Sequence, residues 1–473
     1  MRFRFHQLGP VDNADLTLGD LTIIAGRNNT GKTYLTYALY GFLDAWRTWP
    51  SAHQFFVGDT YRQLSAEFPR PRLPDIRRLA REAQETGQAI HPVAPEALHK
   101  VRDALLPALA RSFSEAMLPA VFSSSAGDFE DAHVSVEFSD PFPESIPPVD
   151  LRLGKDRRLS LEYGSGNLAL RWAGGDGRRR HLLQMVSHLY HQLVCTGFPD
   201  PFILSAERFG ISLFYKELDF AKSQLIDLLQ QMGNKEERAR SSPYFIIDRN
   251  TSRYALPIKD NIDYTRSISE IRGQLGPLGG RRVFNEIRDM MGGYYKASSE
   301  DITFTSRTRG DNRFEIPLHL ASSSVRGLSD LYFFLKYVAH ENHLLIVDEP
   351  ESHLDTTNQI QLARLLSKLV RVGVKVMITT HSDYLIKEIN NLIMLHHVSQ
   401  SKNHPAKKFG YHPNDALEAR SVRAYVADSR GLTEARIDRF GIEMPVFDET
   451  IDKINKTANA LAAALEVDGK DAC

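Results

Sequence analysis

The sequence predicts an α/β fold, because short apolar strands alternate along it with helical segments. Residues 21–25 form an apolar run that is typical of a buried strand, and residues 34–40 suit a buried helix. Toward the other end of the chain, strands are predicted at 344–347 and 374–379, with a helix between them at 357–371. Alternation of this kind is typical of α/β domains.

Length and composition indicate a globular protein of more than one lobe. The chain has 473 residues, of which 42% are hydrophobic and 25% charged, and its net charge of −1 gives no global sign of nucleic-acid binding. Its two cysteines, Cys195 and Cys473, have no metal-site spacing and predict no disulfide framework. The N-terminus resembles a strand rather than a signal peptide, and no apolar stretch is long enough to span a membrane. We therefore expect a cytoplasmic protein without a membrane partner.

The middle of the chain predicts inserted elements. Residues 76–117 are expected to be largely helical with a break near 87–95, and residues 122–131 and 139–149 are expected to be loops. Alternating runs predict a small antiparallel sheet, and they lie at 134–138, 159–163 and 168–172.

Three further helices are expected. Residues 211–235 predict an amphipathic helix with heptad-like spacing, and residues 325–340 a second helix. Near the C-terminus a third helix is predicted at 447–465, with Asp448 as its N-cap.

The strongest signal is a phosphate-binding motif between the first buried strand and the first buried helix. Its residues fit the pattern G-x-x-x-x-G-K-[ST] and are Gly26, Arg27, Asn28, Asn29, Thr30, Gly31, Lys32 and Thr33. The glycines allow the backbone to approach phosphate, whose charge is favoured by backbone N–H groups and by the helix N-terminus. We expect Lys32 to reach the β- and γ-phosphates of ATP and Thr33 to ligate Mg²⁺. A chance glycine-rich turn is the alternative, and the flanking strand and helix disfavour it.

Two carboxylates follow the strand at 344–347. In P-loop enzymes a carboxylate at this place binds the metal, so Asp348 is expected to hold Mg²⁺. Glu349 is expected to be the general base that polarises the attacking water. His381, which follows the next strand, is expected to contact the γ-phosphate or that water. The alternatives are an acidic turn for the carboxylates and a structural role for the histidine.

The order of these motifs resembles that of the ATP-binding-cassette ATPases. By this resemblance Asp355 matches the D-loop aspartate and His381 the switch histidine. The family's signature loop is matched less closely by residues 321–327, because Ser322 stands at the key serine but no glycine pair follows it. The nucleotide contacts expected from this loop are Ser322, Ser323 and Arg326, the last as a substitute cation.

The spacing of the motifs resembles one branch of that family. Between Lys32 and Asp348 lie about 316 residues (348 − 32), more than a compact cassette needs. This resembles the SMC/RecF/OLD branch of soluble cassettes, whose members insert arms or lobes there. Residues 205–208, 348–355 and 379–385 are also similar to bacterial "AAA family" ATPases, which are often encoded in anti-phage defence or toxin operons beside a nuclease.

The resemblance implies an α/β P-loop NTPase with an ATP-binding-cassette head, an inserted antiparallel β subdomain and a helical lobe. The expected parts are the N-terminal part of the ATPase lobe with its insertions (1–210), the helical lobe with a short arm and the signature-like loop (211–343), the C-terminal part of the ATPase lobe (344–395) and a C-terminal extension (396–473).

The resemblance also implies a homodimer in which two heads enclose two ATP molecules. Each site would take Lys32, Asp348 and His381 from one copy, and Ser322 and Asp355 from the other. Glu207 lies where the Q-loop is expected and would sense the metal or the attacking water. A salt bridge between lobes made by Glu207–Arg208 is an equal alternative.

Two weaker patterns have ordinary explanations. Residues 151–181 are rich in lysine and arginine, which suits contact with a DNA backbone but equally a solvated hairpin surface. His188 and His191 are three apart on a predicted helix, and without a third ligand we interpret them as structural or surface residues.

The favoured function is an ATPase that dimerises on ATP and acts as sensor or regulator of a separate effector protein, such as a nuclease, in anti-phage defence. The alternative is a RecF-like ATPase of DNA repair or recombination that binds DNA directly. A nuclease or toxin within this chain is disfavoured, because no Asp-x-Asp pattern follows residue 390 and no zinc-ligand spacing occurs.

Overall fold

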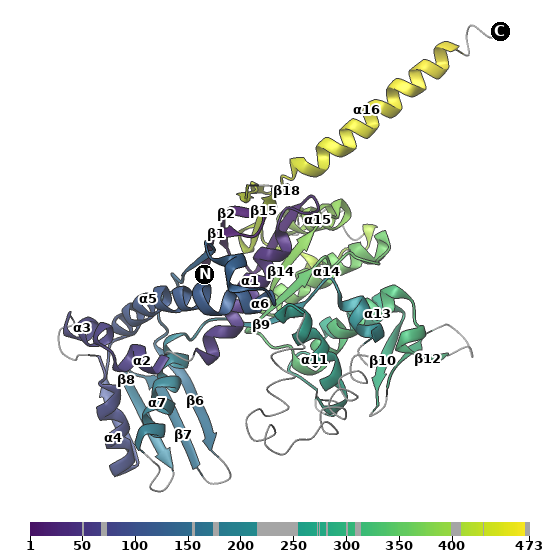
Figure 1. The fold of residues 1–473 in the computed structure, drawn as a ribbon. Coiled ribbons are helices and arrows are strands. Elements are labelled where there is room, and N and C mark those ends of the chain that lie inside the picture. Colours follow the sequence, from purple (N-terminus) through teal and green to yellow (C-terminus); the bar gives the residue numbers. More distant parts are fainter. Residues whose placement is uncertain are drawn as a thin grey trace, which may run out of the picture.

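The computed structural model describes most of the chain, and Figure 1 shows its fold. The described residues are 1–49, 52–67, 73–153, 157–173, 179–214, 254–271, 273, 275–280, 282–298, 301–307, 314–398, 408–428 and 430–468. The helix predicted at 211–235 lies outside them beyond residue 214. None of the helices in the described part is long and apolar enough to cross a membrane.

A six-stranded sheet forms the centre of the molecule, with strand order β16-β15-β3-β14-β13-β9. Its strands are β3 (Leu21–Gly26), β9 (Asp200–Leu204), β13 (His343–Asp348), β14 (Lys375–Thr380), β15 (Val422–Ala427) and β16 (Leu432–Glu434). All neighbours pair in parallel except β15 and β16. The helices that follow the strands are α1 (Lys32–Ala45), α14 (Thr356–Arg371) and α15 (Asp383–Val398). This confirms the predicted α/β fold. β15 and β16 come from residues 396–473, which the sequence analysis set apart as an extension.

Both faces of the central sheet are buried, which explains why its strands are continuous apolar runs. Along β13, Leu344 and Ile346 belong to one hydrophobic core, and Leu345 and Val347 belong to the other. The first core contains the N-terminal segments and the inserted sheet, and the second contains the helical lobe and α14. The carboxyl ends of β3, β14 and β13 therefore meet at one edge between two packed layers.

A three-stranded antiparallel sheet precedes the central one, in the order β2-β1-β5. Its strands are β1 (Arg2–Leu8), β2 (Val11–Thr17) and β5 (His133–Glu137). We expected only two strands before residue 25, and β2 is the one missed, since its sequence VDNADLT is mostly polar. We also assigned residues 134–138 to the inserted sheet, and this was wrong. Phe3 and Phe5 pair with Val136 and Val134, so β5 follows the apolar face of β1.

The inserted sheet has four antiparallel strands in the order β4-β8-β7-β6, which confirms its type. They are β4 (Gln88–Pro92), β6 (Ser145–Leu153), β7 (Arg157–Gly164) and β8 (Asn167–Ala173). The break predicted near 87–95 is thus partly a strand. The loop predicted at 139–149 was wrong from residue 145 onward, because Pro147 and Pro148 lie at a register shift on the edge strand β6. An edge strand tolerates proline, since one row of its N–H groups needs no partner.

Helices cover the inserted sheet and join it to the body. They are α2 (Ala52–Val57), α3 (Asp59–Glu67), α4 (Ile76–Thr86), α5 (Pro95–Ser112), α6 (Leu118–Val121) and α7 (Arg179–Val194). Figure 1 shows α4 and α7 beside β6–β8, well away from the central sheet.

A second lobe combines helices with a small sheet. Its elements are α11 (Leu256–Ile271), α12 (Arg282–Met291), β10 (Gly293–Ala297), β11 (Ile302–Ser306), β12 (Glu315–Pro317) and α13 (Ser323–Phe333). After two short strands, β17 (Ile437–Asp438) and β18 (Gly441–Ile442), the described chain ends in α16 (Pro445–Asp468). Asp448 is not the N-cap that we predicted, because the helix begins at Pro445. The fixed φ of proline suits the first turn of a helix.

Candidate active site

The phosphate-binding motif forms a turn between β3 and α1 that only certain residues can adopt. Gly31 has a φ of +83° and is the N-cap of α1, and Asn29 has a φ of +65°. A Cβ added at Gly31 would lie 2.3 Å from Cγ2 of Val11. This position therefore requires glycine both for its backbone conformation and for the approach of β2.

Lys32 is folded back into the turn. Its Nζ donates to the carbonyl oxygens of Gly26 at 3.0 Å and of Arg27 at 2.7 Å, and the residue is 6% exposed. The hydroxyl of Thr30 donates to the same Arg27 carbonyl at 2.9 Å. Burial lowers the pKa of Lys32, an effect that the nearby Glu349 and Asp348 oppose. Arg27, Asn28 and Asn29 are exposed, so the turn presents backbone and a lysine ammonium to an incoming phosphate.

Asp348 is the buried centre of the site. Its Oδ2 accepts from the Thr33 hydroxyl at 3.0 Å, its Oδ1 accepts from Thr379, and the residue is 1% exposed. Burial raises the pKa of Asp348, and the two hydroxyl donors oppose that shift. Hydroxyl and carboxylate oxygens are the donors that Mg²⁺ prefers. A divalent cation would also offset the cost of burying the carboxylate, so Thr33 and Asp348 fit a magnesium site.

Glu349 lies beside this pair in a strained backbone conformation, with a φ of +49°. Its N–H donates to the Thr379 hydroxyl at 3.0 Å, and its carboxylate accepts from the Ser352 hydroxyl at 3.2 Å. The side chain remains 32% exposed. A non-glycine residue at positive φ costs energy and is maintained where the surrounding structure imposes it. Thr379 therefore positions both carboxylates, a role that the sequence analysis did not assign.

His381 is held by a glutamate that the sequence analysis also missed. Its Nδ1 lies 3.2 Å from Oε1 of Glu351 and 3.8 Å from Oε1 of Glu349. Glu351 is 4% exposed, and it also accepts from the His381 N–H and the Thr380 hydroxyl, each at 2.7 Å. In the sequence Glu351 is one of several polar residues after the strand, and nothing in their pattern marks it as buried.

Glu207 and Arg208 act separately. Glu207 is exposed and accepts from the Tyr37 hydroxyl of α1 at 3.0 Å. Arg208 is buried, and its guanidinium donates to the backbone carbonyls of Asp348 at 2.7 Å, Glu349 at 2.8 Å and Ser205 at 3.0 Å. Burial lowers the pKa of Arg208 to about 10, with the surrounding carboxylates opposing that shift. Arg208 thus binds backbone carbonyls at the end of β13, rather than forming the salt bridge between lobes that was the alternative for Glu207–Arg208.

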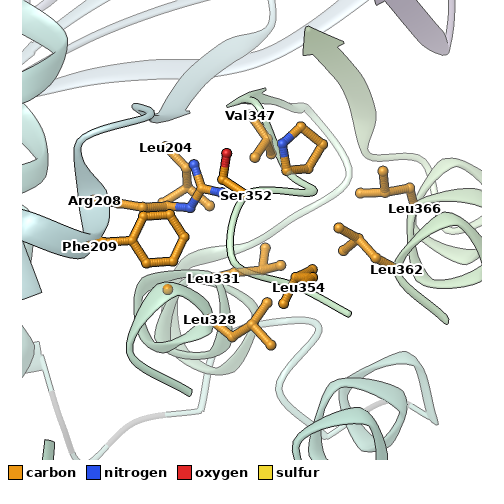
Figure 2. A pocket seen from close by; sticks show the side chains of 12 residues that line it. Leu204, Arg208, Phe209, Leu328, Leu331, Val347, Ser352, Leu354, Leu362 and Leu366 are labelled. Carbon is orange, nitrogen blue, oxygen red and sulfur yellow. The ribbon is translucent and has the colours of Figure 1, made fainter. Parts of the chain in front are cut away.

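Phe209, the residue after Arg208, connects the end of β13 to α13. Figure 2 shows Arg208 and Phe209 on one side of an apolar pocket whose other walls are Leu328 and Leu331 of α13 and Leu354. The Phe209 ring lies 4.1 Å from the His353 ring between centroids, and a Cβ added at Gly327 would lie 1.9 Å from the Phe209 ring. Gly327 therefore lets α13 approach the segment that holds Asp348 and Glu349.

The signature-like loop and Asp355 are not linked to Lys32 by a described contact. Ser322 is the exposed N-cap of α13 and accepts from the Val325 N–H at 3.3 Å, and Ser323 is the first residue of that helix. Asp355 is the exposed N-cap of α14 and accepts from the Asn358 N–H at 3.0 Å. Each thus has a local capping role.

Arg326 is directed toward its own loop. Its guanidinium donates to the carbonyl oxygens of Ala321 at 2.5 Å and His319 at 3.3 Å. As placed here it stabilises the entry to α13, and it would have to turn outward to contact a nucleotide.

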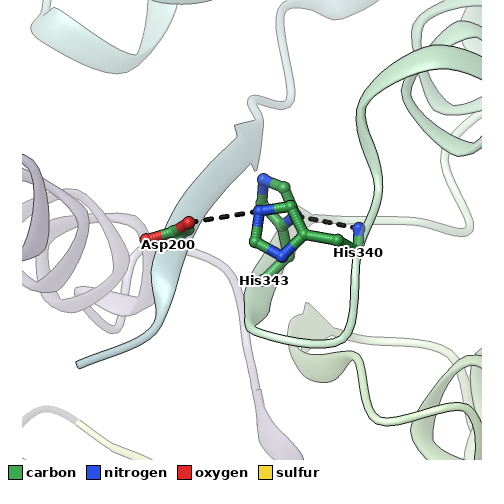
Figure 3. A group of neighbouring side chains, drawn as sticks. All are labelled: Asp200, His340 and His343. Atoms are coloured by element: carbon green, nitrogen blue, oxygen red, sulfur yellow. Dashed lines mark hydrogen bonds and ion pairs between the residues drawn. The ribbon is translucent and has the colours of Figure 1, made fainter. Parts of the chain in front are cut away.

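A second group of possible metal ligands lies at the opposite edge of the sheet, where β9 and β13 begin. Figure 3 shows Asp200, His340 and His343 close together. His340 lies 3.2 Å from Asp200 through Nε2, and Arg47 forms an ion pair with the same carboxylate. Each histidine accepts a backbone N–H at Nδ1, from Asn342 and His340 respectively. A metal on Nε2 would require a proton on Nδ1, facing those N–H donors. The cluster is therefore better explained as a hydrogen-bonded link between the two strands.

The weaker sequence patterns have structural explanations. His191 is buried and its Nε2 lies 2.5 Å from the Trp46 carbonyl oxygen, and burial lowers its pKa to about 4. His188 lies 3.0 Å from the Gln192 amide. In the basic segment, Arg158 and Arg171 form ion pairs with Asp150 and Glu162. These pairs make the two guanidinium groups less available to a phosphate backbone.

A family model matches part of this chain. Residues 221–386 match the family model of the AAA ATPase domain, a range that contains Asp348, Glu349 and His381 and begins after the phosphate-binding turn. No curated protein matches the chain. Together with the turn at Lys32, the match confirms that the protein is an ATPase.

The solved structures that are similar to the chain include SMC heads and RecF. The SMC head domain from Thermotoga maritima is 10% identical and covers 92% of this chain and 98% of its own, with a TM-score of 0.28. The Smc head with an extended coiled coil, bound to the C-terminal domain of ScpA from Pyrococcus furiosus, is 11% identical, covers 97% and 98%, and has a TM-score of 0.31. RecF of the RecFOR pathway is 11% identical, covers 92% and 97%, and has a TM-score of 0.30.

The contacts of Arg208 predict a loss of both stability and activity on substitution. Arg208→Met removes the guanidinium donor from the buried carbonyl of Asp348, and an unsatisfied buried group costs roughly 1–3 kcal/mol. We expect a lower free energy of unfolding in urea and a reduced ATPase rate, with the larger loss for Met than for Lys. Arg420→Lys is the matched control, because the Arg420 side chain is 87% exposed. Equal stability of Arg208→Met and the wild type would contradict the role of the guanidinium.

A buried aspartate next to this arginine predicts a pH dependence. Asp330 of α13 is 2% exposed, and burial raises its pKa to about 7. From about pH 4 to 7 the folded chain keeps a proton that the unfolded chain releases, so the free energy of unfolding falls as pH rises through this range. Between pH 5 and pH 8, the free energy of unfolding of Asp330→Asn in urea should rise by roughly 1–3 kcal/mol relative to that of the wild type. The exposed Asp12→Asn is the control. Parallel pH profiles for Asp330→Asn and wild type would refute the assignment.

Proposed function

We propose that this ATPase dimerises when it binds ATP, and that the ATP-bound dimer controls a separate effector protein. The observation that carries the proposal is the open state of the site in one copy. The side chains of Glu349 and His381 are 32% and 46% exposed, although both are expected to act on the terminal phosphate. Catalysis of phosphoryl transfer needs donors and positive charge on several sides of the phosphate. A second copy would supply the missing side.

Within one copy the residues suit ATP hydrolysis. Lys32 would move from its two carbonyl partners to the β- and γ-phosphates, and Thr33 and Asp348 would hold Mg²⁺. The ion, when bound, neutralises charge on the β- and γ-phosphate oxygens. Glu349 would take a proton from the attacking water. Glu351 would hold the His381 ring through Nδ1, which leaves Nε2 to contact the γ-phosphate or the attacking water.

The second copy would contribute the N-termini of two helices. Ser322 and Ser323 begin α13, Asp355 begins α14, and the two cap residues, Ser322 and Asp355, are exposed. A helix N-terminus favours an anion, which suits α13 to the γ-phosphate of the other copy. Arg326 would add positive charge at that place. Glu207, which contacts α1 through Tyr37, would report metal or water binding to the second lobe.

The proposed effector role rests on the resemblance to ATPases of anti-phage defence operons, in which a nuclease is often a separate chain. Direct action on DNA, as in RecF, is less favoured. Arginines of the basic segment, Arg158 and Arg171, are paired with acidic neighbours, which reduces their availability to a phosphate backbone.

Slowed hydrolysis should trap the ATP-bound assembly. We expect Glu349→Gln to bind ATP, to lose most of its ATPase activity, and to sediment faster with ATP than without it, because head association or closure raises the sedimentation coefficient. Lys32→Ala, which removes the phosphate-binding ammonium, should show no such change. An unchanged profile of Glu349→Gln on adding ATP would contradict the proposal. Stimulation of the wild-type ATPase by DNA, without a partner protein, would favour the RecF-like alternative.

A site shared between two copies predicts complementation. Lys32→Ala and Asp355→Ala should each be nearly inactive. In a dimer of either variant, both sites lack one residue, Lys32 from one copy or Asp355 from the other. Mixed in equal amounts, unfolded in urea and refolded together, they should recover about a quarter of wild-type activity, because half of a random mixture is heterodimer with one intact site. Asp75→Ala is the matched control, because Asp75 is likewise an N-cap, of α4, and should retain activity. No recovery on mixing would show that Asp355 acts within its own copy.

A further inference from the structure

The helix α16 is exposed along its described length. Every residue from 452 through 462 is exposed, with Ile454 and Leu461 each 62% exposed. Figure 1 shows the helix extending away from the body, with the C-terminus at its far end. Among the described residues of one copy, therefore, the middle of this helix has no surface against which to bury its apolar side chains.

An isolated helix with this sequence is poorly stable in water. Asn455, Thr457 and Asn459 are weak helix formers, and helical segments without tertiary contacts are marginal even with good helix formers. The 24 residues of α16 therefore need a partner to remain helical.

The apolar residues of α16 follow the seven-residue spacing of a coiled coil. Ile454, Ala458 and Leu461 are separated by four and then three residues. In the sequence the same alternation of four and three continues with apolar residues at 447, 451 and 465. A repeat of 3.5 residues per turn forms a narrow seam that another helix covers through knobs-into-holes packing. The chemistry of this face therefore specifies a helical partner.

The residues that flank the seam favour a second copy of the same helix. Asn455 and Ala462 lie on one side and Thr457 on the other, and none of them is charged; Asp448, near the start of the helix, is a charged residue at the same flanking position as Asn455. Coiled coils that pair two different helices commonly use charged residues at these flanking positions. The exposed charges Asp452 and Lys456 lie at other positions of the repeat. Two identical helices can thus pair along the seam without like charges opposed.

We propose that α16 pairs with α16 of a second copy in a short coiled coil that does not require nucleotide. The pairing goes beyond the ATP-dependent association proposed above. It would keep the heads of two chains at high local concentration, so that ATP binding acts on chains that are already linked.

The test compares full-length chains without nucleotide by sedimentation equilibrium, in a Lys32→Ala background that removes nucleotide-driven association. We expect the parent chain to form dimers, and Ile454→Asp/Leu461→Asp to raise the dissociation constant by more than roughly tenfold, because two apolar side chains per helix lose their burial. Ile454→Leu/Leu461→Met, which keeps the seam apolar, should still associate.

The matched control is Asn459→Asp/Ala460→Asp, which adds the same charge to exposed positions away from the seam and should still dimerise. A monomeric parent chain, or equal loss in both aspartate pairs, would overturn the proposal, as would a monomer that binds a different helical protein or lipid vesicles through this helix. ATP binding by each pair with Lys32 intact shows that the head is folded. The result is independent of complementation between Lys32→Ala and Asp355→Ala, so either proposal can fail alone.

Discussion

The candidate site depends on a single buried carboxylate. Asp348 accepts hydrogen bonds from Thr33 at the start of α1 and from Thr379 at the end of β14. These bonds are possible because β14 lies between β3 and β13, so that the carboxyl ends of three parallel strands share one edge. A buried charge is tolerated when donors or a cation compensate it. The same Thr379 hydroxyl accepts the N–H of Glu349, so the residues proposed to hold the metal and to activate water are fixed by one side chain.

Arg208 extends this rigid unit toward the second lobe. Its guanidinium binds the carbonyls of Asp348 and Glu349, while the adjacent Phe209 packs against Gly327 of α13. A shift of this buried guanidinium would break its bond to the Asp348 carbonyl, which is costly in a buried place. Movement of α13, whose N-terminus carries Ser322, would therefore displace Phe209 and Arg208 and so the backbone at the end of β13. This connection is the physical basis on which a partner at α13 could be sensed by the hydrolytic residues.

Two surfaces of the molecule lack cover within one copy, for different reasons. At the edge where the nucleotide is proposed to bind, Glu349 and His381 are partly exposed, although the chemistry proposed for them would require exclusion of bulk water. On α16, Ile454 and Leu461 are exposed although apolar burial is what stabilises such a helix. The first surface would be covered only while ATP is bound, and the second at all times. Assembly of this ATPase is thus expected to have one switched and one permanent component.

The sequence by itself determined the phosphate-binding turn, the strand that carries Asp348 and Glu349, and the place of His381, because each depends on local spacing and on apolar runs. It also predicted the α/β class and the type of the inserted sheet. The tertiary structure decided what distant segments do together. Glu351 and Thr379 acquire their roles from burial and from the strand order, Arg208 binds carbonyls from β13, and the polar β2 is a strand because β1 pairs with it. Contacts between segments far apart in the chain leave no periodic signal in the sequence, since they depend on how the strands are ordered in the sheet.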